Sequence, residues 1–334
     1  MADTRPSNRG AAGTPPGRKG ESAPPVTSYN FRSVVPKGLN LDFVGKRFIF
    51  LAISTALNVL AIVLLFVNGL NLGIDFKGGT DIRVRFVEPT TSTALRQELA
   101  ELNLKDLTVQ DFGVQGKEFL LRFEVAEGDE MSSVADTLRN QFRKQHAQEN
   151  SFEILSVESV GPRVGSNLRR QGFMAVAVAT VFMGIYIALR FQWSFGLGAV
   201  VALAHDVLIT IGALILTRLS FDLTTLAALL TVVGFSVHDT IIVSDRIREN
   251  LRRNRRASLA DVINQSINET LARTLLTTGT ALLVLLALFF LGGSGLQPFA
   301  VCLITGFITG TYSSIYIATP VVLLWSDRSK LGHG

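Results

Sequence analysis

The sequence lacks the residues that hold small secreted domains together. Its 334 residues contain one cysteine, Cys302, which lies inside an apolar run and cannot form a disulfide within the chain. A disulfide-stapled secretory fold is therefore excluded. Charged residues are also scarce, at 18 % of the chain, whereas 48 % of the residues are hydrophobic and the mean hydropathy is positive. This composition is too apolar for an ordinary soluble domain.

No pattern typical of catalysis or of cofactor binding is present. The glycines at 73, 78 and 79 match no nucleotide-binding fingerprint, because no strand–loop–helix context surrounds them. The His and Asp residues at 205, 206, 238 and 239 have no zinc-site spacing. We therefore expect no enzyme activity, no cofactor and no metal. A formal charge of +5 would be compatible with nucleic-acid binding, but the basic residues are placed as the topology of a membrane protein requires. We therefore expect no nucleic-acid partner.

The apolar residues are concentrated in blocks long enough to cross a membrane. About 18 or more consecutive apolar residues span the hydrocarbon layer, which is about 30 Å thick. Five blocks clearly reach this length, and a sixth, Phe173–Leu189, is shorter but carries no charge. These six blocks predict an α-helical integral membrane protein. The expected transmembrane helices cover residues 47–70, 172–189, 195–216, 221–244, 273–291 and 299–325.

The distribution of Lys and Arg predicts the orientation of these helices. Short loops rich in basic residues stay in the cytoplasm. Six arginines lie between Arg246 and Arg256, whereas the loops on the opposite side hold only Arg218. Both termini are therefore expected in the cytoplasm, with residues 326–334 as the C-terminal segment. Residues 1–46 are interpreted as a disordered basic tail with a juxtamembrane segment, followed by an uncleaved first helix.

Residues 71–171 are predicted to form a periplasmic α+β domain. Apolar residues alternate with polar ones at 81–86, and helical or strand patterns follow in the order β-α-β-β-α-β. That order is typical of a ferredoxin-like split βαβ sandwich. The glycines at 73–79 and 161–165 indicate tight connections between this domain and the membrane. Such a domain binds a peptide at a sheet edge or simply packs against a neighbour, and the sequence leaves both open.

Ionisable residues inside the apolar blocks are the candidates for function, because burying a charge in a membrane is costly. Asp239 lies about 8 Å inside the expected cytoplasmic end of its helix. Arg273 starts the next helix at a similar depth, so the two can pair. An Arg that approaches and retreats would make Asp239 release and take up a proton. The alternative is a static salt bridge that fixes helix packing.

A candidate polar path surrounds this pair. Its members are Ser236, His238, Thr240, Thr277, His205 and Asp206. His238 either tunes Asp239 or packs against another helix, and Asp206 either relays protons or belongs to a structural hydrogen-bond cluster, with His205 facing elsewhere. The segment 245–272 is expected to be a basic loop followed by an interfacial helix that Ser258 caps. Gly306 and Gly310 form a close-packing surface, internal or toward a partner.

Several sequence blocks resemble the SecF branch of the SecD/SecF family, within the resistance-nodulation-division superfamily. In the family's order, they lie at 73–80, 160–165, 205–207, 233–240, 245–249 and 270–275. The resemblance implies a bacterial inner-membrane subunit that pairs with SecD and associates with the SecYEG channel and YajC. It implies that the subunit uses the proton-motive force to move unfolded preproteins, with Asp239 and Arg273 as coupling residues. His238 stands where many members have Asn, and sodium stays open as the coupling ion.

Two other readings remain at the level of sequence. One is a half-size proton-driven efflux transporter of the same superfamily, although the chain has only one modest soluble domain. The other is a scaffold subunit that holds its partner without coupling an ion. Membrane lipid is an expected contact in each case, and the basic segment after the fourth helix would attract anionic lipid.

Overall fold

The structure is a computed structural model in which most of the chain is described. The described residues are 41–102, 104–112, 116–124, 131–145 and 151–331. Of the segment 1–46, predicted to be a disordered basic tail with a juxtamembrane stretch, residues 1–40 lie outside the described residues, so the tail stays a prediction.

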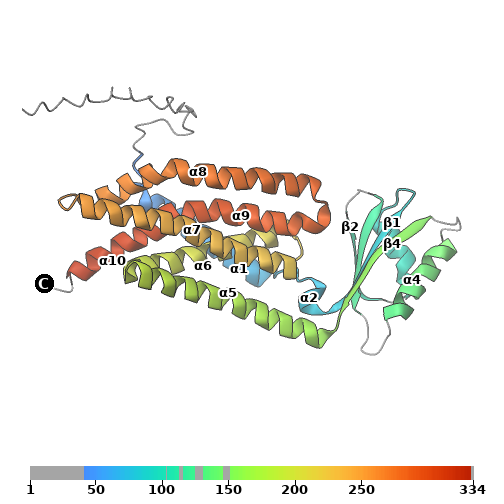
Figure 1. The fold of residues 1–334 in the computed structure, drawn as a ribbon. Helices are drawn as coiled ribbons and strands as arrows, with labels where there is room; N and C mark the ends of the chain where they lie inside the picture. Colours follow the sequence, from blue (N-terminus) through green and yellow to red (C-terminus); the bar gives the residue numbers. More distant parts are fainter. Residues whose placement is uncertain (1–40, 103, 113–115, 125–130, 146–150, 332–334) are drawn as a thin grey trace, which may run out of the picture. The chain divides into compact units, whose positions relative to one another are not determined.

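Within the described residues, six helices are long and apolar enough to cross a membrane, as predicted. The first precedes an α+β domain and the other five follow it (Figure 1). They are α1 (Arg47–Val67), α5 (Pro162–Arg190), α6 (Trp193–Thr217), α7 (Leu223–Arg253), α8 (Leu259–Leu291) and a last helix formed by η2 (Ser294–Leu296), α9 (Gln297–Ser313), a π-turn η3 (Ser314–Ala318) and α10 (Thr319–Leu331).

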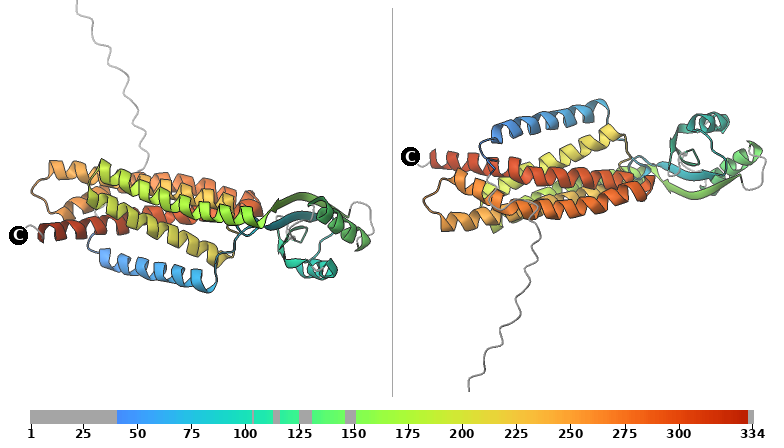
Figure 2. Two further views of the ribbon diagram at one scale, coloured as in Figure 1. Left: turned by 90° about the horizontal axis from the view of Figure 1, so that it is seen from below. Right: turned by 90° about the horizontal axis from the view of Figure 1, so that it is seen from above.

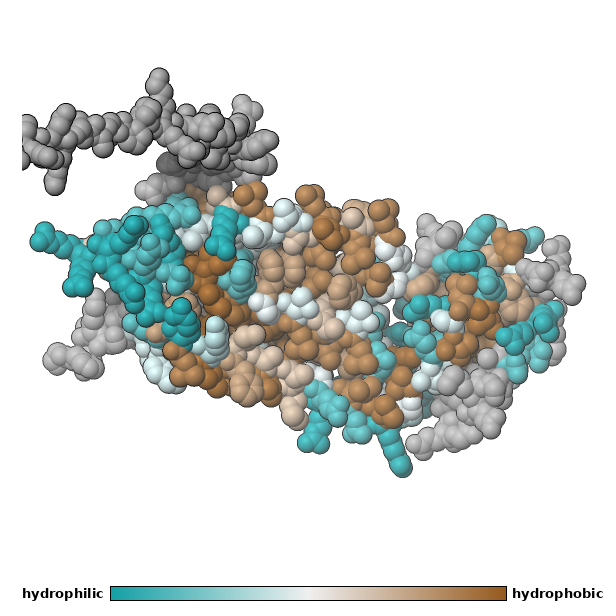
Figure 3. All heavy atoms as spheres, viewed as in Figure 1, coloured by the Kyte–Doolittle hydropathy of each residue, from teal (hydrophilic) through white to brown (hydrophobic). Residues whose placement is uncertain are grey.

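Three of these helices form the centre of the bundle. In the most apolar window of α6, of α7 and of the last helix, 56 % of residues are buried, against 11 % for α1 and 17 % for α8. Figure 2 shows α1 beside α6, on the outside of the bundle. The outer helices expose large apolar side chains, and Figure 3 shows hydrophobic residues over the helices with hydrophilic residues around the α7–α8 turn. This surface suits contact with lipid or with other helices.

Two helix boundaries differ from the sequence-based prediction. Helix α5 begins at Pro162, ten residues before the predicted transmembrane start at 172. Helix α7 continues to Arg253 and α8 begins at Leu259, so most of the predicted loop at 245–272 is helical and no separate interfacial helix exists. Ser258 does cap α8, by accepting from the Asp261 amide, as expected. Hydropathy marks where a helix enters lipid, whereas a helix continues into water until a stop signal ends it.

The glycine pair in the last helix packs inside the chain. A Cβ atom added to Gly306 would lie 2.1 Å from Val232 Cγ2, and one added to Gly310 would lie 3.0 Å from Ser236 Cβ. Both neighbours belong to α7. The small-xxx-small surface is therefore internal, and it brings the backbones of α7 and α9 close together.

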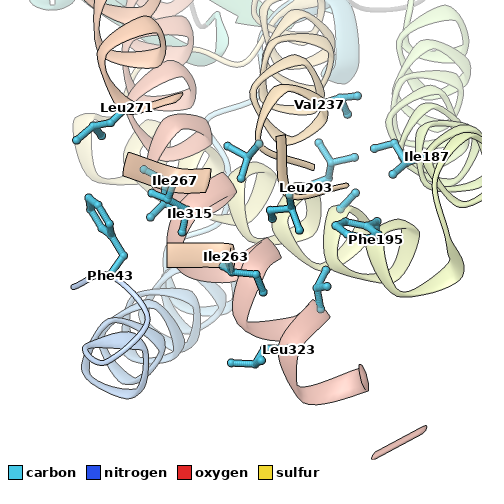
Figure 4. Packing of buried hydrophobic residues seen from close by; sticks show 14 of the residues in the cluster. Phe43, Ile187, Phe195, Leu203, Val237, Ile263, Ile267, Leu271, Ile315 and Leu323 are labelled. Carbon is cyan, nitrogen blue, oxygen red and sulfur yellow. The ribbon is translucent and has the colours of Figure 1, made fainter. Parts of the chain in front are cut away.

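An apolar core fills the end of the bundle near the α7–α8 turn. It joins side chains from the segment before α1 to side chains from five helices, including Phe43, Ile187, Leu203, Val237 and Ile267 (Figure 4). Ile263 and Ile267 of α8 and Ile315 of the π-turn belong to this cluster. The start of α8, predicted to lie at the interface, is thus held in this core.

The soluble domain has the predicted topology. Its four strands are β1 (Gly79–Phe86), β2 (Lys105–Asp111), β3 (Glu118–Glu124) and β4 (Phe152–Val160), in the antiparallel order β2-β3-β1-β4. Its helices are α3 (Ser92–Leu99), with the 3₁₀ turn η1 (Ala100–Leu102), and α4 (Met131–Gln145). This is the split βαβ arrangement of ferredoxin-like domains.

Alternation along β1 separates the two faces of the sheet. Ile82, Val84 and Phe86 are buried together with residues of α3 and α4, as the period-2 pattern predicted. On the other face Asp81 pairs with Arg122 of β3 across the strands, at 2.8 Å. Burial lowers the pKa of Arg122, but the hydrogen bond and the charge of Asp81 outweigh it and raise that pKa above its usual value.

The predicted tight connection at 73–79 is confirmed. A short helix α2 (Ile74–Lys77) links α1 to β1, and Gly78 and Gly79 have φ angles of 83° and 124°. A Cβ atom on Gly78 would lie 2.8 Å from Pro162 Cα, at the start of α5. Only glycine fits this positive φ and this close approach, so the pair fixes the entrance and the exit of the domain side by side.

Candidate functional site: a buried acidic network in the helix bundle

Two carboxylates are buried on neighbouring central helices. Asp206 lies at the middle of α6 and is 0 % exposed, and Asp239 lies on α7 and is 1 % exposed. Both helices are in the centre of the bundle, where lipid does not reach. Carboxylates in such a place need partners, and the partners define the site.

Asp206 holds three helices together. One of its carboxylate oxygens, Oδ2, accepts hydrogen bonds from Ser236 of α7 at 2.6 Å and from Ser313 of α9 at 2.7 Å. The other oxygen, Oδ1, lies 2.9 Å from His205 Nδ1. Thr210, one turn later, donates to the Asp206 backbone carbonyl instead of to the carboxylate. Both oxygens of the Asp206 carboxylate therefore have partners, and the residue links α6, α7 and α9.

The contact between His205 and Asp206 corrects the expectation that His205 faces elsewhere. Adjacent residues point about 100° apart around a helix, but Nδ1 lies close to the histidine Cβ and reaches the neighbouring carboxylate. The ring of His205 also stacks on Tyr312 of α9, with centroids 5.9 Å apart. Its Nε2 is buried and has no partner among the described residues.

Tyr312 carries the network to α1. Its hydroxyl donates to the Phe50 carbonyl at 2.9 Å and lies 2.7 Å from Ser54 Oγ. Ser54 is buried although most of α1 is exposed. The polar contacts of α9 therefore tie the outermost helix to the central ones.

Asp239 is less fully paired than Asp206. Its Oδ2 accepts from Thr311 of α9 at 3.2 Å, and Thr311 in turn lies 2.7 Å from Thr278 of α8. Its Oδ1 is buried and has no hydrogen-bond partner within the described part of the chain. Thr274 Oγ1, on the same stretch of α8, is likewise buried without a partner. The site thus combines one bonded and one free carboxylate oxygen.

The two carboxylates belong to one network. Ser236 and Asp239 are one turn apart on α7, and Thr311 and Ser313 are two residues apart on α9. Helix α7 therefore carries Ser236, which binds Asp206, and Asp239 itself. Helix α9 carries Ser313, which binds Asp206, and Thr311, which binds Asp239. A shift of α9 along α7 changes the hydrogen bonds of both carboxylates together.

Arg273 is near Asp239 without forming an ion pair with it in the described residues. Arg273 is near enough for its positive charge to act on Asp239. The Arg273 side chain is exposed and lines a cavity of about 530 Å³ at the same end of the bundle as the α7–α8 turn. That cavity is also lined by three acidic residues and by two further arginines, namely Asp245, Glu249, Glu269, Arg190 and Arg246, so Arg273 faces an open space of mixed charge.

The remaining members of the predicted path have simpler roles in this arrangement. Thr240 donates to the Ser236 carbonyl of its own helix, and Thr277 donates to the Arg273 and Thr274 carbonyls. His238 is exposed on α7, away from the hydrogen bonds of Asp239. Bonds of this type satisfy a hydroxyl locally and do not link helices.

Sequence reasoning missed the contribution of the last helix. Thr311, Tyr312 and Ser313 supply partners for Asp239, His205 and Asp206, respectively. A signal was present, because these hydroxyl residues interrupt an otherwise apolar span. No group of three or more His, Cys, Asp or Glu side chains in the described ranges could hold a metal ion.

The geometry defines a class of protein: a six-helix membrane bundle with buried carboxylates and one ferredoxin-like domain. Residues 140–328 match the family model of the protein export membrane protein SecD/SecF, C-terminal, and residues 63–90 match the SecD/SecF GG motif, which includes Gly78 and Gly79. The chain belongs to the SecD/SecF family.

Relatives with established names belong to the SecF branch of that family. The protein translocase subunit SecF of Calditerrivibrio nitroreducens is 41 % identical, over 90 % of this chain and 99 % of the relative. The subunit of the same name from Magnetococcus marinus is 45 % identical, over 88 % of this chain and 94 % of the relative. The chain is thus similar to SecF subunits over nearly their whole length, which indicates a multi-pass inner-membrane component of transport.

Solved structures give the same picture. The crystal structure of SecDF from Thermus thermophilus, a translocon-associated membrane protein, superimposes with a TM-score of 0.78 at 38 % identity. A second structure, of SecDF in the super-membrane-facing form, gives 0.65 at 39 % identity. They cover 87 % and 88 % of this chain, which spans only about two fifths of each SecDF chain (39 % and 40 %). The fold is therefore one half of a resistance-nodulation-division-type architecture.

Proposed function

We propose that this chain is the SecF-type half of an ion-driven export complex. In this proposal it pairs with SecD, associates with SecYEG and YajC, and uses the proton-motive force to help draw unfolded preproteins across the membrane. Both termini would face the cytoplasm, and the α+β domain would face the periplasm. Asp239 would bind and release the proton, and Arg273 would supply the positive charge that replaces the proton when it leaves.

The free oxygen of Asp239 is the observation that carries this proposal. A carboxylate fixed for structural reasons alone is expected to use both oxygens, as Asp206 does. Asp239 keeps Oδ1 buried and unpaired, and a guanidinium that stays charged at every physiological pH lies nearby in an open cavity. A proton on Oδ1 would neutralise the site, and an inward movement of Arg273 would replace that proton.

An uncovered polar strip supports a second bundle as partner. His238 on α7 and Arg273 and Thr277 on α8 are exposed on helices that cross the membrane. Such side chains are costly in lipid and are usually placed toward protein or water. A homologous six-helix subunit would cover this strip. The solved SecDF chains are about two and a half times as long as the part that this chain matches.

The test uses inverted inner-membrane vesicles that contain the full chain with its SecD partner. A preprotein is stalled during translocation, ATP is exhausted, and completion is followed with and without a proton gradient. We expect the gradient to speed completion for wild type and not for Asp239→Asn, since Asn cannot exchange a proton. Asp136→Asn, an exposed carboxylate on α4, is the matched control and should behave as wild type.

The outcomes separate the readings. If Asp239→Asn responds to the gradient as wild type does, the residue is structural and the chain is a scaffold. A response that persists with a protonophore but requires sodium would make sodium the coupling ion. Co-purification with SecD, measured for each variant, distinguishes lost coupling from lost assembly.

A further inference from the structure

A cavity lies between α5 and the central helices, at the end of the bundle next to the α+β domain. Its volume is about 160 Å³. Helix α5 makes close approaches at Gly172, where an added Cβ atom would meet Leu226, and at Gly184, where it would meet Val200. Between these two contacts α5 stands off from its neighbours, and Val176 and Ala177 line the space that is left.

The walls of this cavity are apolar with one exception. Phe76, Val207, Phe221 and Leu229 contribute from α2, α6, the α6–α7 connection and α7, and Arg169 of α5 is the one charged residue of the lining. The far wall is held by two contacts, since Phe76 stacks on Phe221 and the Gly73 amide donates to the Phe221 carbonyl at 2.8 Å. The cavity is thus a formed space and not a gap between mobile segments.

The cavity opens on the outer surface of the bundle. Phe173 and Ala177, which line it, are exposed on α5. An apolar cavity of about this volume stays free of water and accepts a guest of about six carbon atoms. In a membrane the surrounding medium supplies such a guest, namely a segment of a lipid acyl chain.

We expect Arg169 to lie at the height of a lipid headgroup. It precedes the uncharged run 171–189 that enters the hydrocarbon layer. Its side chain is exposed and makes no hydrogen bond or ion pair within the described ranges, and neither does that of Arg170 next to it. An arginine without a counter-charge at this depth is complementary to a phosphate group.

We propose that this cavity is a binding site for an anionic phospholipid of the leaflet next to the α+β domain. One acyl chain enters between α5 and α7, and the phosphate binds Arg169. Since an acyl chain is as well solvated in the bilayer as in the cavity, the chain contributes close packing, and the headgroup contact supplies the preference for negative charge. This site is separate from Asp239 and does not depend on ion coupling.

The experiment measures lipid retention by native mass spectrometry. The full chain is reconstituted in nanodiscs with equal amounts of phosphatidylglycerol and phosphatidylcholine, alone and with SecD, and is released under mild activation. We expect one retained phosphatidylglycerol, preferred about fivefold over phosphatidylcholine, in both samples. Arg169→Gln should reduce the preference to about one, and Ala177→Phe, which fills the entrance, should remove both lipids.

Adjacent residues of α5 provide matched controls. Arg170→Gln removes a charge at the same depth without touching the cavity, and Ala175→Phe adds a ring on the exposed side of the helix. Both should retain lipid as wild type does. If Ala177→Phe does not elute as a folded protein, the smaller change Ala177→Leu replaces it. Three outcomes would overturn the proposal. The preference for phosphatidylglycerol could fall as much in Arg170→Gln as in Arg169→Gln, it could stay unchanged in Arg169→Gln, or SecD could displace the lipid.

Discussion

Replacing Asp206 by Ala should destabilise the bundle by about 3 kcal/mol. In the wild-type chain its carboxylate accepts from Ser236 and Ser313 and contacts His205. Ser313 has a second acceptor, the Gly310 carbonyl at 3.2 Å, so it loses little. Ser236 and His205 Nδ1 would be left buried without partners. An interhelical hydrogen bond inside a membrane contributes about 0.6 kcal/mol on average, and each orphaned polar group costs about 1–3 kcal/mol.

Asp206→Asn is the matched variant. An amide can place its oxygen where Oδ2 is and its NH₂ toward His205 Nδ1, so it keeps the three contacts if the histidine accepts there. We expect it to cost about 1 kcal/mol, well below the cost of the alanine. A further comparison uses Ser236→Ala in both backgrounds. This change should destabilise the bundle when Asp206 is present, but it should recover part of the lost stability when Asp206 is already alanine, because it removes the orphaned hydroxyl.

The assay is unfolding of the full chain in mixed micelles by titration with sodium dodecyl sulfate, followed by circular dichroism. The midpoint shift gives the change in the free energy of unfolding for each variant. Equal losses for Asp206→Ala and Asp206→Asn would refute the reasoning, since the hydrogen bonds would then not be the cause. Additive effects of the Asp206 and Ser236 changes would do the same.

Three further changes test other contacts. Asp222→Ala removes the N-cap of α7, which accepts from the Thr225 amide at 2.8 Å, and should cost about 1 kcal/mol in the same titration. Gly306→Ala places a Cβ atom against Val232 and should cost about 1–3 kcal/mol, and adding Val232→Ala should restore most of it; no rescue would argue against this contact. Arg122→Gln breaks the pair with Asp81 in the sheet and should lower the free energy of unfolding of the soluble domain by about 2 kcal/mol. The measurement is urea unfolding of this domain within the full chain. A loss under about 0.5 kcal/mol would mean that the pair is only a surface contact.

The sequence predicted the soluble domain well because local patterns determine it. The alternation at 81–86 gave the buried face of β1. Thr91 caps α3 by accepting from the Ala94 amide, and Thr directly before an apolar-periodic stretch is a local signal for such a cap. The element order then limited the topology to a few choices. Each of these signals is contained within a short stretch of the chain.

The acidic network could be predicted only in part. Helical periodicity placed Ser236 and Asp239 on one side of α7, and that side is buried. It could not say which side of α9 would face them, because that depends on how the backbones cross. The close contact of Gly306 and Gly310 with α7 sets this crossing, and it brings Thr311 and Ser313 to the two carboxylates. Partners from distant helices follow from packing and not from spacing.

Helix α5 has a mechanical consequence. It runs without interruption for 29 residues, about 44 Å, and Gly161 alone separates it from strand β4. Such a helix is a stiff rod that begins at the last strand of the domain and ends on the far side of the bundle. If α5 pivots by about 10° about its end in the bundle, its other end, next to strand β4, moves by about 8 Å. A small rearrangement among the central helices would thus be delivered to the domain as a large displacement, with no flexible linker to absorb it.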